Sequence, residues 1–216
     1  MEKKENRFVG RLENRVAIVT GGAKGIGYVT CNTFSREGAS VVIVDMDKEA
    51  AEKAAQEIND KGGKALAVAA NLTVAEEREA IFAKAVEKFG KVDILINNAG
   101  WGCKTPFLEM TEEPFDRSIN LNMKATYFMI QLACKQMIKQ GTGGRIVSTS
   151  STAAFQGEKN GSIYSGTKAA IIAFSRAIAL EVGQYGINVN CVAPGFTRTN
   201  NNGHIPGSID ENFLQI

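Results

Sequence analysis

The chain has 216 residues, 44% of them hydrophobic, which is enough for one sizeable core and predicts a single domain over residues 1–216. The net charge of +2, with lysine and arginine scattered among acids, argues against a nucleic-acid partner. Four widely separated cysteines and one histidine give no metal-ligand spacing, and no apolar run approaches a membrane span, so we expect no metal site, no membrane contact and a soluble cytoplasmic protein.

The first predicted elements form a phosphate-binding corner. After a loose lead-in over residues 1–14, the apolar residues 16–19 predict a buried strand, and a helical pattern later extends through Phe34. Between them lies the segment Thr20-Gly21-Gly22-Ala23-Lys24-Gly25-Ile26-Gly27. Glycines let the backbone turn sharply and approach a ligand, and a helix N-terminus offers free N–H groups and a positive dipole end. We therefore predict that this segment binds a phosphate group.

The second predicted strand, residues 41–45, ends in an acid that bears on the choice of cofactor. Asp45 lies 18 residues after Gly27, where a dinucleotide-binding fold places the acid that binds the adenine-ribose 2′-hydroxyl. A carboxylate there repels a 2′-phosphate and favours NAD over NADP, whereas Lys24 favours NADP because it could reach a phosphate. Asp45 could instead cap the helix that follows, but Asp47 is the better candidate for that cap.

The rest of the chain continues to alternate between strands and helices. Further strands are predicted at residues 64–70, 92–96, 145–148 and 187–192; helices at 73–89, with Thr73 and Glu76 as a capping box, at 112–140, with a possible break near 120–122, and at 161–182. This alternation predicts an α/β fold with a doubly wound parallel sheet, a Rossmann fold with six strands in the order 3-2-1-4-5-6. Ligands of such sheets bind beyond the carboxyl ends of the strands.

One predicted helix carries a candidate acid/base pair. Tyr164 and Lys168 are four residues apart, so their side chains lie on the same helix face. A phenol is a poor acid/base at neutral pH, and a nearby positive charge favours the phenolate. The pair is therefore a candidate proton donor and acceptor. Taken alone, the spacing also fits a tyrosine packed beside a solvated lysine.

Five motifs in order give the chain a wider resemblance. From about Leu12 to Thr199 it resembles the short-chain dehydrogenase/reductase family, on these segments: Thr20-Gly21-x-x-x-Gly25-Ile26-Gly27, Asn97-Asn98-Ala99-Gly100, Ser151, Tyr164-x-x-x-Lys168 and Pro194-Gly195-x-x-x-Thr199. The resemblance implies an enzyme that transfers a hydride between a nicotinamide dinucleotide and a secondary alcohol or ketone.

The resemblance also implies four catalytic residues. Tyr164 would be the acid/base, Ser151 would hold the substrate oxygen, Lys168 would bind the nicotinamide ribose and lower the pKa of Tyr164, and Asn122 would hold a water that links Lys168 to solvent. Ser151 lies 13 residues before Tyr164 and is preferred to Ser150, and Asn122 is preferred to Asn120.

Contacts with the cofactor are implied in the same way. They are Gly21, Lys24, Gly25, Ile26 and Gly27 at the pyrophosphate corner, Asp45 at the adenine ribose, Asn71 and Leu72 at the adenine, and Asn98, Tyr164, Lys168, Thr197 and Thr199 toward the nicotinamide. Asn71 departs from the family, which usually has aspartate there; an amide can still hydrogen-bond the adenine edge.

The C-terminal part departs further from the family pattern. Family members usually continue into a seventh strand, whereas residues 200–216 read as a loop-like tail. The sixth strand would then be an open edge, and the substrate pocket would lack one wall. Three hypotheses stay open: an NAD(H)-dependent oxidoreductase, an NADPH-dependent 3-oxoacyl thioester reductase, and a shortened non-catalytic form that binds dinucleotide or partner subunits. The family also implies a homo-oligomer formed through helices 112–140 and 161–182.

Overall fold

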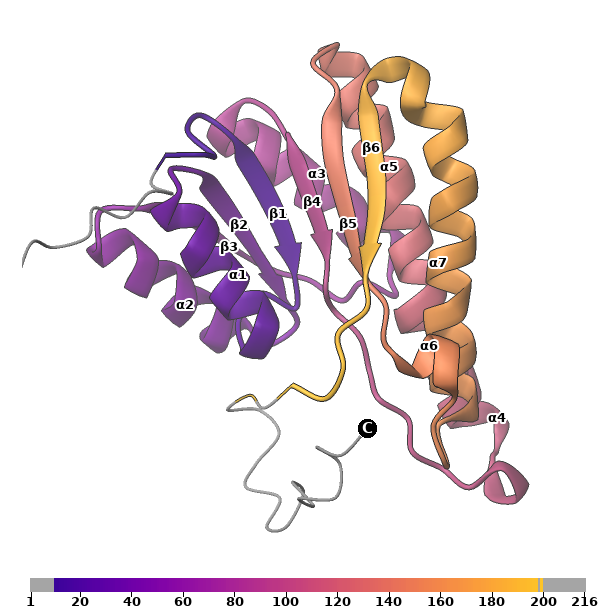
Figure 1. Ribbon diagram of the computed structural model, residues 1–216. Helices are drawn as coiled ribbons and strands as arrows, with labels where there is room; N and C mark the ends of the chain where they lie inside the picture. The colour runs from indigo at the N-terminus through magenta and orange to yellow at the C-terminus, as the bar shows by residue number, and fades with distance from the viewer. Residues whose placement is uncertain (1–9, 198, 200–216) are drawn as a thin grey trace, which may run out of the picture.

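A six-stranded parallel sheet forms the centre of the protein (Figure 1). The computed structural model describes residues 10–197 and 199. The strands follow one another in the order β3-β2-β1-β4-β5-β6, which confirms the predicted fold class. Their bounds are β1 Val16–Thr20, β2 Ser40–Asp45, β3 Lys64–Ala69, β4 Ile94–Asn97, β5 Gly144–Thr149 and β6 Ile187–Val192. Among the described residues no strand pairs with the outer edge of β6.

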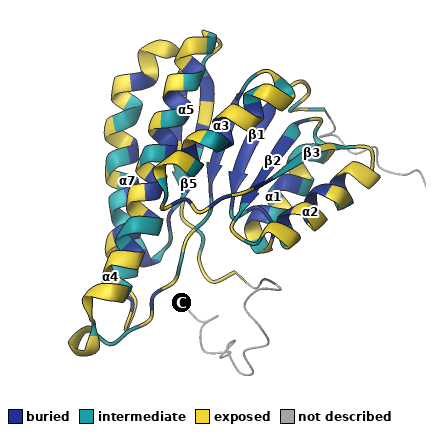
Figure 2. Cartoon of the chain, turned by 180° about the vertical axis from the view of Figure 1, so that it is seen from behind, coloured by how far each residue is buried: buried dark blue, intermediate teal, exposed yellow. Residues whose placement is uncertain are grey.

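Helices cover both faces of the sheet (Figure 1). α1 (Gly25–Arg36) and α2 (Lys48–Asp60) lie against one face, over β1, β2 and β3. α3 (Ala75–Phe89), α5 (Thr126–Gln140) and α7 (Ser162–Val182) lie against the other. β1 is buried along its whole length because helices cover both of its faces. Figure 2 shows the result: the central strands β1 and β2 are buried, whereas the edge strand β3 is partly exposed, and the helices expose their outer sides.

The long helical stretch predicted at 112–140 is three segments in the structure. α4 (Glu112–Ser118) leads into a π-helix, Ile119–Ala125, which continues directly as α5. The predicted break near residues 120–122 is therefore a local widening of the helix and not a turn. π-Helical segments are rare and often occur at functional sites. Here the segment holds Asn122, whose side chain is fully buried.

Two local predictions fail. Thr73 does not cap α3: the helix begins at Ala75, and its N-cap, Val74, makes no capping bond with its side chain. The Thr73 amide and hydroxyl both donate instead to the side-chain oxygen Oδ1 of Asn71, at 3.0 and 2.8 Å, and this local turn competes with the capping box. A one-turn helix, α6 (Ala153–Gln156), was not predicted because the segment is too short for a periodic pattern.

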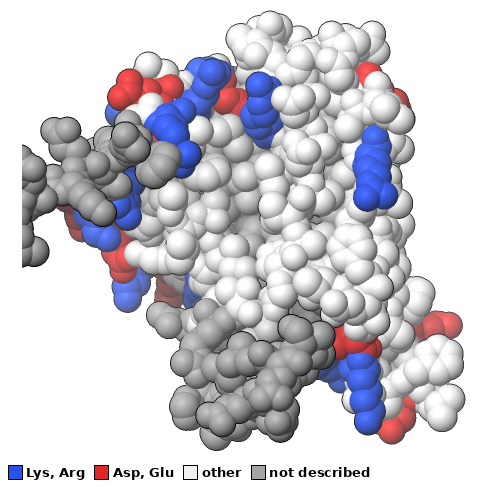
Figure 3. All heavy atoms as spheres, in the orientation of Figure 1, with Lys and Arg blue, Asp and Glu red and all other residues white. Residues whose placement is uncertain are grey.

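The described chain is anchored at its amino end. Residues 10–14, predicted as part of a loose lead-in, are anchored: Leu12 packs on the core, and its amide donates to the Glu37 carbonyl at 2.9 Å. The predicted tail, residues 200–216, lies outside the described residues. Within the described chain no helix is long and apolar enough to cross a membrane. Figure 3 shows basic and acidic side chains mixed around the margin of one face and not gathered in a patch of one sign.

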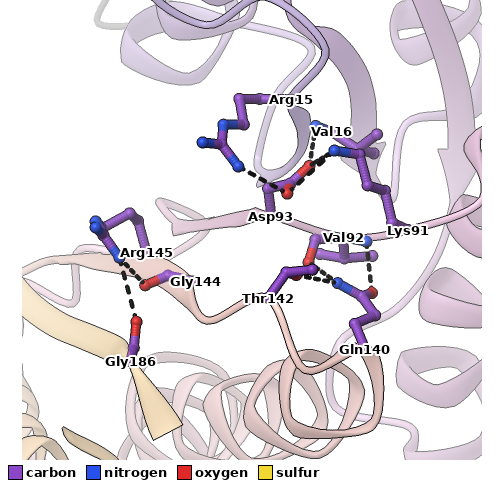
Figure 4. Close-up of polar contacts among 10 residues, drawn as sticks. All are labelled: Arg15, Val16, Lys91, Val92, Asp93, Gln140, Thr142, Gly144, Arg145 and Gly186. Atoms are coloured by element: carbon purple, nitrogen blue, oxygen red, sulfur yellow. Dashed lines mark hydrogen bonds and ion pairs between the residues drawn. The ribbon is translucent and has the colours of Figure 1, made fainter.

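A polar network joins the strands at the amino ends of β1 and β4 (Figure 4). The Asp93 side chain is 5% exposed and accepts a hydrogen bond from the Val16 amide at 2.8 Å. It also forms ion pairs with Arg15 at 3.3 Å and Lys91 at 3.1 Å. Beside it, the Gln140 side chain accepts from the Val92 amide and donates to the Val92 carbonyl. These contacts fix the register of β1 and β4 at the edge away from the predicted site.

We expect Asp93→Ala to lower the free energy of unfolding by about 2 kcal/mol, because it leaves the Val16 amide buried without an acceptor. The loss of the ion pairs costs less, because the Arg15 and Lys91 side chains remain in contact with water. Asp93→Asn, which keeps an acceptor of the same shape, should lose clearly less. Urea denaturation followed by circular dichroism measures both variants; equal losses would show that the charge, and not the amide contact, dominates.

Candidate active site

The predicted site residues follow the carboxyl ends of the strands, which meet at the lower edge of the sheet in Figure 1. In a parallel sheet these ends converge on one edge, so segments that are distant in sequence become neighbours. β1 leads into the glycine-rich corner, β2 into Asp45, β4 into Asn98 and β5 into Ser151. α7 begins at the same edge and carries Tyr164 and Lys168 in its first two turns.

The glycine-rich corner between β1 and α1 depends on its glycines. Gly21 and Gly25 have φ of +60° and +55°, in the left-handed region that favours glycine. A Cβ on Gly27 would lie 2.0 Å from the Gly21 carbonyl oxygen, so α1 can pack this close only with glycine there. Ile26, between them, is 38% exposed at the surface of the corner.

The start of α1 is suited to a phosphate. Its N-cap, Lys24, makes no capping bond with its side chain, and no acid lies in the first turn. The first N–H groups of a helix lack intrahelical partners and, with the helix dipole, attract an anion. α2 differs, since Asp47 caps it by accepting from the Ala50 amide at 3.0 Å. The residues at α1 therefore fit the pyrophosphate of a dinucleotide.

Asn98 closes this corner from the β4 side. Its side-chain amide donates to the carbonyls of Thr20 and Gly21, at 3.1 Å each. The Thr20 hydroxyl in turn accepts from the amides of Asn98 and Ala99, at 3.0 and 3.1 Å. Asn98 thus holds the glycine-rich turn in place, in addition to the nicotinamide contact that was predicted for it.

Asp45 lies at the end of β2 beside the same corner. Its carboxylate accepts from the amides of Ala23 and Asp47, at 3.2 Å each. Asp47 is the N-cap of α2, as predicted, and Asp45 is not. The Lys24 ammonium does not point freely into solvent but pairs with Asp47 at 2.6 Å.

The two residues predicted at the adenine lie after β3. Asn71 is exposed, and its side-chain oxygen is engaged by Thr73. Leu72 is 7% exposed and belongs to the core, while its carbonyl accepts from Arg78 at 2.6 Å. A contact of Leu72 with a ligand is therefore limited to its backbone.

Lys168 is the buried cation of the site. It is 4% exposed, and its ammonium donates to the Thr149 carbonyl at 2.8 Å and lies 5.7 Å from the centre of the Tyr164 ring. Burial disfavours the charged form and lowers the pKa of Lys168 to about 8. The Tyr164 ring itself is half-buried. The expected proximity of the phenol and the ammonium is present.

Asn122 is held tightly beside Lys168. Its side-chain oxygen accepts from the Trp101 amide at 2.7 Å, and its nitrogen donates to the Trp101 carbonyl at 2.9 Å and to the Thr167 hydroxyl at 3.3 Å. A Cβ on Gly100 would lie 3.2 Å from the Asn122 oxygen and 3.3 Å from the Lys168 nitrogen. The loop after β4, the π-helix and α7 therefore meet at this point.

The two rival serines occupy different environments. Ser150 is 2% exposed, and its hydroxyl donates to the Lys168 carbonyl at 2.8 Å. Ser151 is half-buried, and its oxygen accepts from the Ala153 amide at 3.2 Å, which leaves its own proton available to a ligand. Ser150 is thus occupied in holding α7, which favours Ser151 as the residue that contacts substrate.

The segment after β6 carries the last two predicted site residues. Thr197 is exposed, and its hydroxyl donates to the Gly195 carbonyl at 3.2 Å. Thr199 is half-buried. This segment is tied to the end of β5, because the Thr152 amide donates to the Pro194 carbonyl at 3.1 Å.

The family model for short chain dehydrogenase matches residues 15–208. The chain belongs to this family. It is 38% identical to the sorbitol dehydrogenase of Cereibacter sphaeroides and, equally, to the galactitol 2-dehydrogenase of Agrobacterium fabrum, in each case over 185 residues that make up 86% of this chain and 71% of the relative. A crystal structure of NAD+-bound xylitol dehydrogenase is 34% identical, with a TM-score of 0.83 over 86% of this chain and 72% of that one.

Membership makes this short-chain dehydrogenase an NAD(P)-dependent oxidoreductase acting on CH–OH groups. Several residues that shape its site escaped the sequence analysis: Thr20, Asp47 as the partner of Lys24, Gly100, Thr149 through its carbonyl, and Thr167. Thr20 and Gly100 are named members of quoted motifs, and Thr167 lies within Tyr164-x-x-x-Lys168, so the motifs could have pointed to these three residues.

Proposed function

We propose that this short-chain dehydrogenase transfers a hydride between NAD(H) and a secondary alcohol or ketone of a polyol or sugar, with Tyr164 as the acid/base. The observation that carries the proposal is the buried ammonium of Lys168 beside the Tyr164 ring, at the carboxyl edge of the sheet. The polyol class is supported by the names of the relatives, sorbitol, galactitol and xylitol dehydrogenases.

Each side chain has a defined part in this reaction. Ser151 donates its hydroxyl proton to the substrate oxygen and orients it toward Tyr164. Tyr164 takes the hydroxyl proton in oxidation and returns it in reduction. Lys168, held by the Thr149 carbonyl, stabilises the phenolate through its positive charge. The bound dinucleotide supplies the hydride acceptor or donor.

Asn122 holds together the segments that carry the catalytic residues. Both ends of its amide are bound to Trp101 or Thr167, so it joins the loop after β4 to α7 next to Lys168. A water held by Asn122 as a link from Lys168 to solvent stays part of the proposal.

NAD is preferred in this proposal because of Asp45. At the end of β2 its carboxylate accepts a bond from the Ala23 amide in the phosphate-binding corner, so it faces that corner. A ribose 2′-hydroxyl can donate to such a carboxylate, whereas a 2′-phosphate is repelled by it. Thr197 and Thr199, after β6, are proposed to contact the nicotinamide end.

The first test is a titration of the chain with NADH and, separately, NADPH, followed by nicotinamide fluorescence. We expect tighter binding of NADH, followed by NAD-dependent oxidation in a screen of sorbitol, galactitol and xylitol. The Asp45→Ala variant should lose about tenfold in NADH affinity, since a hydrogen bond to a charged group is removed. Its affinity for NADPH should rise. Asp45→Asn, which keeps an acceptor, is the matched control for charge.

The opposite preference for NADPH would contradict the role of Asp45 and favour the thioester-reductase hypothesis. Binding of dinucleotide without turnover of any alcohol would favour the non-catalytic hypothesis.

We also propose a homo-oligomer, located in the cytoplasm, that associates through α4, α5 and α7. Phe115, Met123 and Tyr127 are 44%, 36% and 42% exposed along α4 and its continuation into α5. The Tyr127 ring lies edge-on to Phe174 of α7, with the centroids 5.5 Å apart, so this apolar surface spans two helices. Exposed apolar surface of this kind is typical of an interface.

A further inference from the structure

Three contacts join the glycine-rich corner to the end of β2 and to the turn between β2 and α2. The Gly22 amide donates to the Val44 carbonyl at 3.0 Å, and the Ala23 amide donates to the Asp45 carboxylate at 3.2 Å. The third contact is between side chains: the Lys24 ammonium lies 2.6 Å from the Asp47 carboxylate. Successive residues of the corner are therefore each tied to the segment that carries Asp45.

The Asp47 carboxylate is held in position by the backbone. One oxygen caps α2 by accepting from the Ala50 amide at 3.0 Å, and the other pairs with Lys24. The Asp47 amide donates to the Asp45 carboxylate at 3.2 Å. The pairing raises the pKa of Lys24 and, with the cap, lowers the pKa of Asp47, so both groups are charged at neutral pH.

This geometry bears on the opposite cofactor preferences of the two residues, since Asp45 favours NAD and Lys24 favours NADP. Lys24 is the cation of the corner that could bind a 2′-phosphate, and it would do so beside Asp45. An exposed ion pair is weak by itself. A phosphate that took Lys24 from Asp47 would, however, lie between two carboxylates, one of them newly unpaired.

We propose that Asp47 is a positioning residue for cofactor choice: it holds Lys24 away from a ribose 2′-phosphate and so keeps the protein selective for NAD(H). This inference rests on the proposed function and deepens it, because it assigns the selectivity to two acids and not to Asp45 alone. Asp45 acts on the ribose directly; Asp47 acts through Lys24.

The decisive variant is Asp47→Asn. Asparagine is as good an N-cap as aspartate, so α2 keeps its cap while Lys24 loses its ionic partner. We expect the Kd for NADPH to fall about tenfold, as a charge-assisted bond between Lys24 and the phosphate becomes available. The Kd for NADH should change less than about twofold, since no charged group at the 2′ position is involved. Fluorescence titration measures both constants.

Two further variants separate this mechanism from a general effect of charge. Glu49→Gln removes an acid from the same first turn of α2 and should leave the NADPH to NADH ratio of Kd values unchanged. In a Lys24→Gln background, Asp47→Asn should lower the Kd for NADPH by less than about threefold, because the cation that the substitution releases is missing.

Several outcomes would overturn the inference. They are an unchanged ratio in Asp47→Asn, an equal gain in Glu49→Gln, or an undiminished gain in the Lys24→Gln background. Each of these can occur while the wild-type chain binds NADH and oxidises alcohols, which would leave the proposed function standing. A wild-type chain that binds neither dinucleotide would overturn both.

Discussion

Tyr164→Phe is expected to lower kcat for alcohol oxidation by about a thousandfold, within the range that a positioned acid/base contributes. Phenylalanine keeps the ring that packs beside Lys168 but has no oxygen to carry the proton. The Kd for NADH should rise by only about threefold, because one contact of the Tyr164 hydroxyl is lost while the glycine-rich corner and Asp45 are untouched. Stopped-flow absorbance of NADH formation under saturating substrate measures the loss.

A matched control for this variant lies elsewhere on the chain. Tyr185 is 48% exposed in a short 3-10 helix after α7, so Tyr185→Phe removes the same oxygen far from the catalytic edge. It should keep the wild-type kcat. A Tyr164→Phe variant that retained more than about a tenth of the activity would contradict the assignment of Tyr164 as the acid/base.

Local sequence patterns predicted much of this structure. β1 is an apolar run followed by glycines and a helix, and each of those signals acts over a few residues. The pairing of Tyr164 with Lys168 is equally local, since four residues of helix bring the two side chains onto one face. The strand order 3-2-1-4-5-6 is that of the Rossmann fold, which the alternation of strands and helices and the glycine-rich turn after the first strand indicated.

The missing parts of the prediction depend on contacts between distant segments. The Thr149 carbonyl meets Lys168 only after β5 and α7 pack, and Gly100 meets Asn122 only when β4 ends beside the π-helix. Lys24 and Asp47 lie in two different turns, before α1 and before α2, and no periodic pattern in the sequence predicts that they pair. The prediction that Thr73 caps α3 failed for another reason. The Asn71 side chain accepts a hydrogen bond from the Thr73 amide, and this local turn competes with the predicted cap.

Lys168→Met should abolish most activity and yet make the protein more stable at neutral pH. Methionine has nearly the same length and no charge, so it fills the same buried space without an ammonium. kcat should fall at least a hundredfold, since the phenolate of Tyr164 loses its positive partner. NADH affinity should also fall, because the ribose loses a donor. Such opposition between stability and activity is typical of groups buried for catalysis.

The stability of this variant should depend on pH in a defined direction. In the unfolded chain a lysine has its ordinary pKa of 10.5, whereas burial lowers the pKa of Lys168 to about 8 in the folded protein. Below pH 8 the ammonium is charged in both states, and the folded protein bears the full penalty of burying it. Between pH 8 and 10.5 the unfolded chain binds more protons, so wild-type stability rises relative to that of Lys168→Met.

Denaturation in the absence of dinucleotide, at pH 7 and at pH 10.5, measures this difference. The advantage of Lys168→Met at pH 7 should be about 1–2 kcal/mol after the lost bond to Thr149 is subtracted, and its change between the two pH values about 3 kcal/mol. Lys139→Met, an exposed site on α5, should follow the wild type at both pH values. A difference for Lys168→Met that stays constant with pH would mean that Lys168 keeps its ordinary proton affinity, and its burial would then not tune the site.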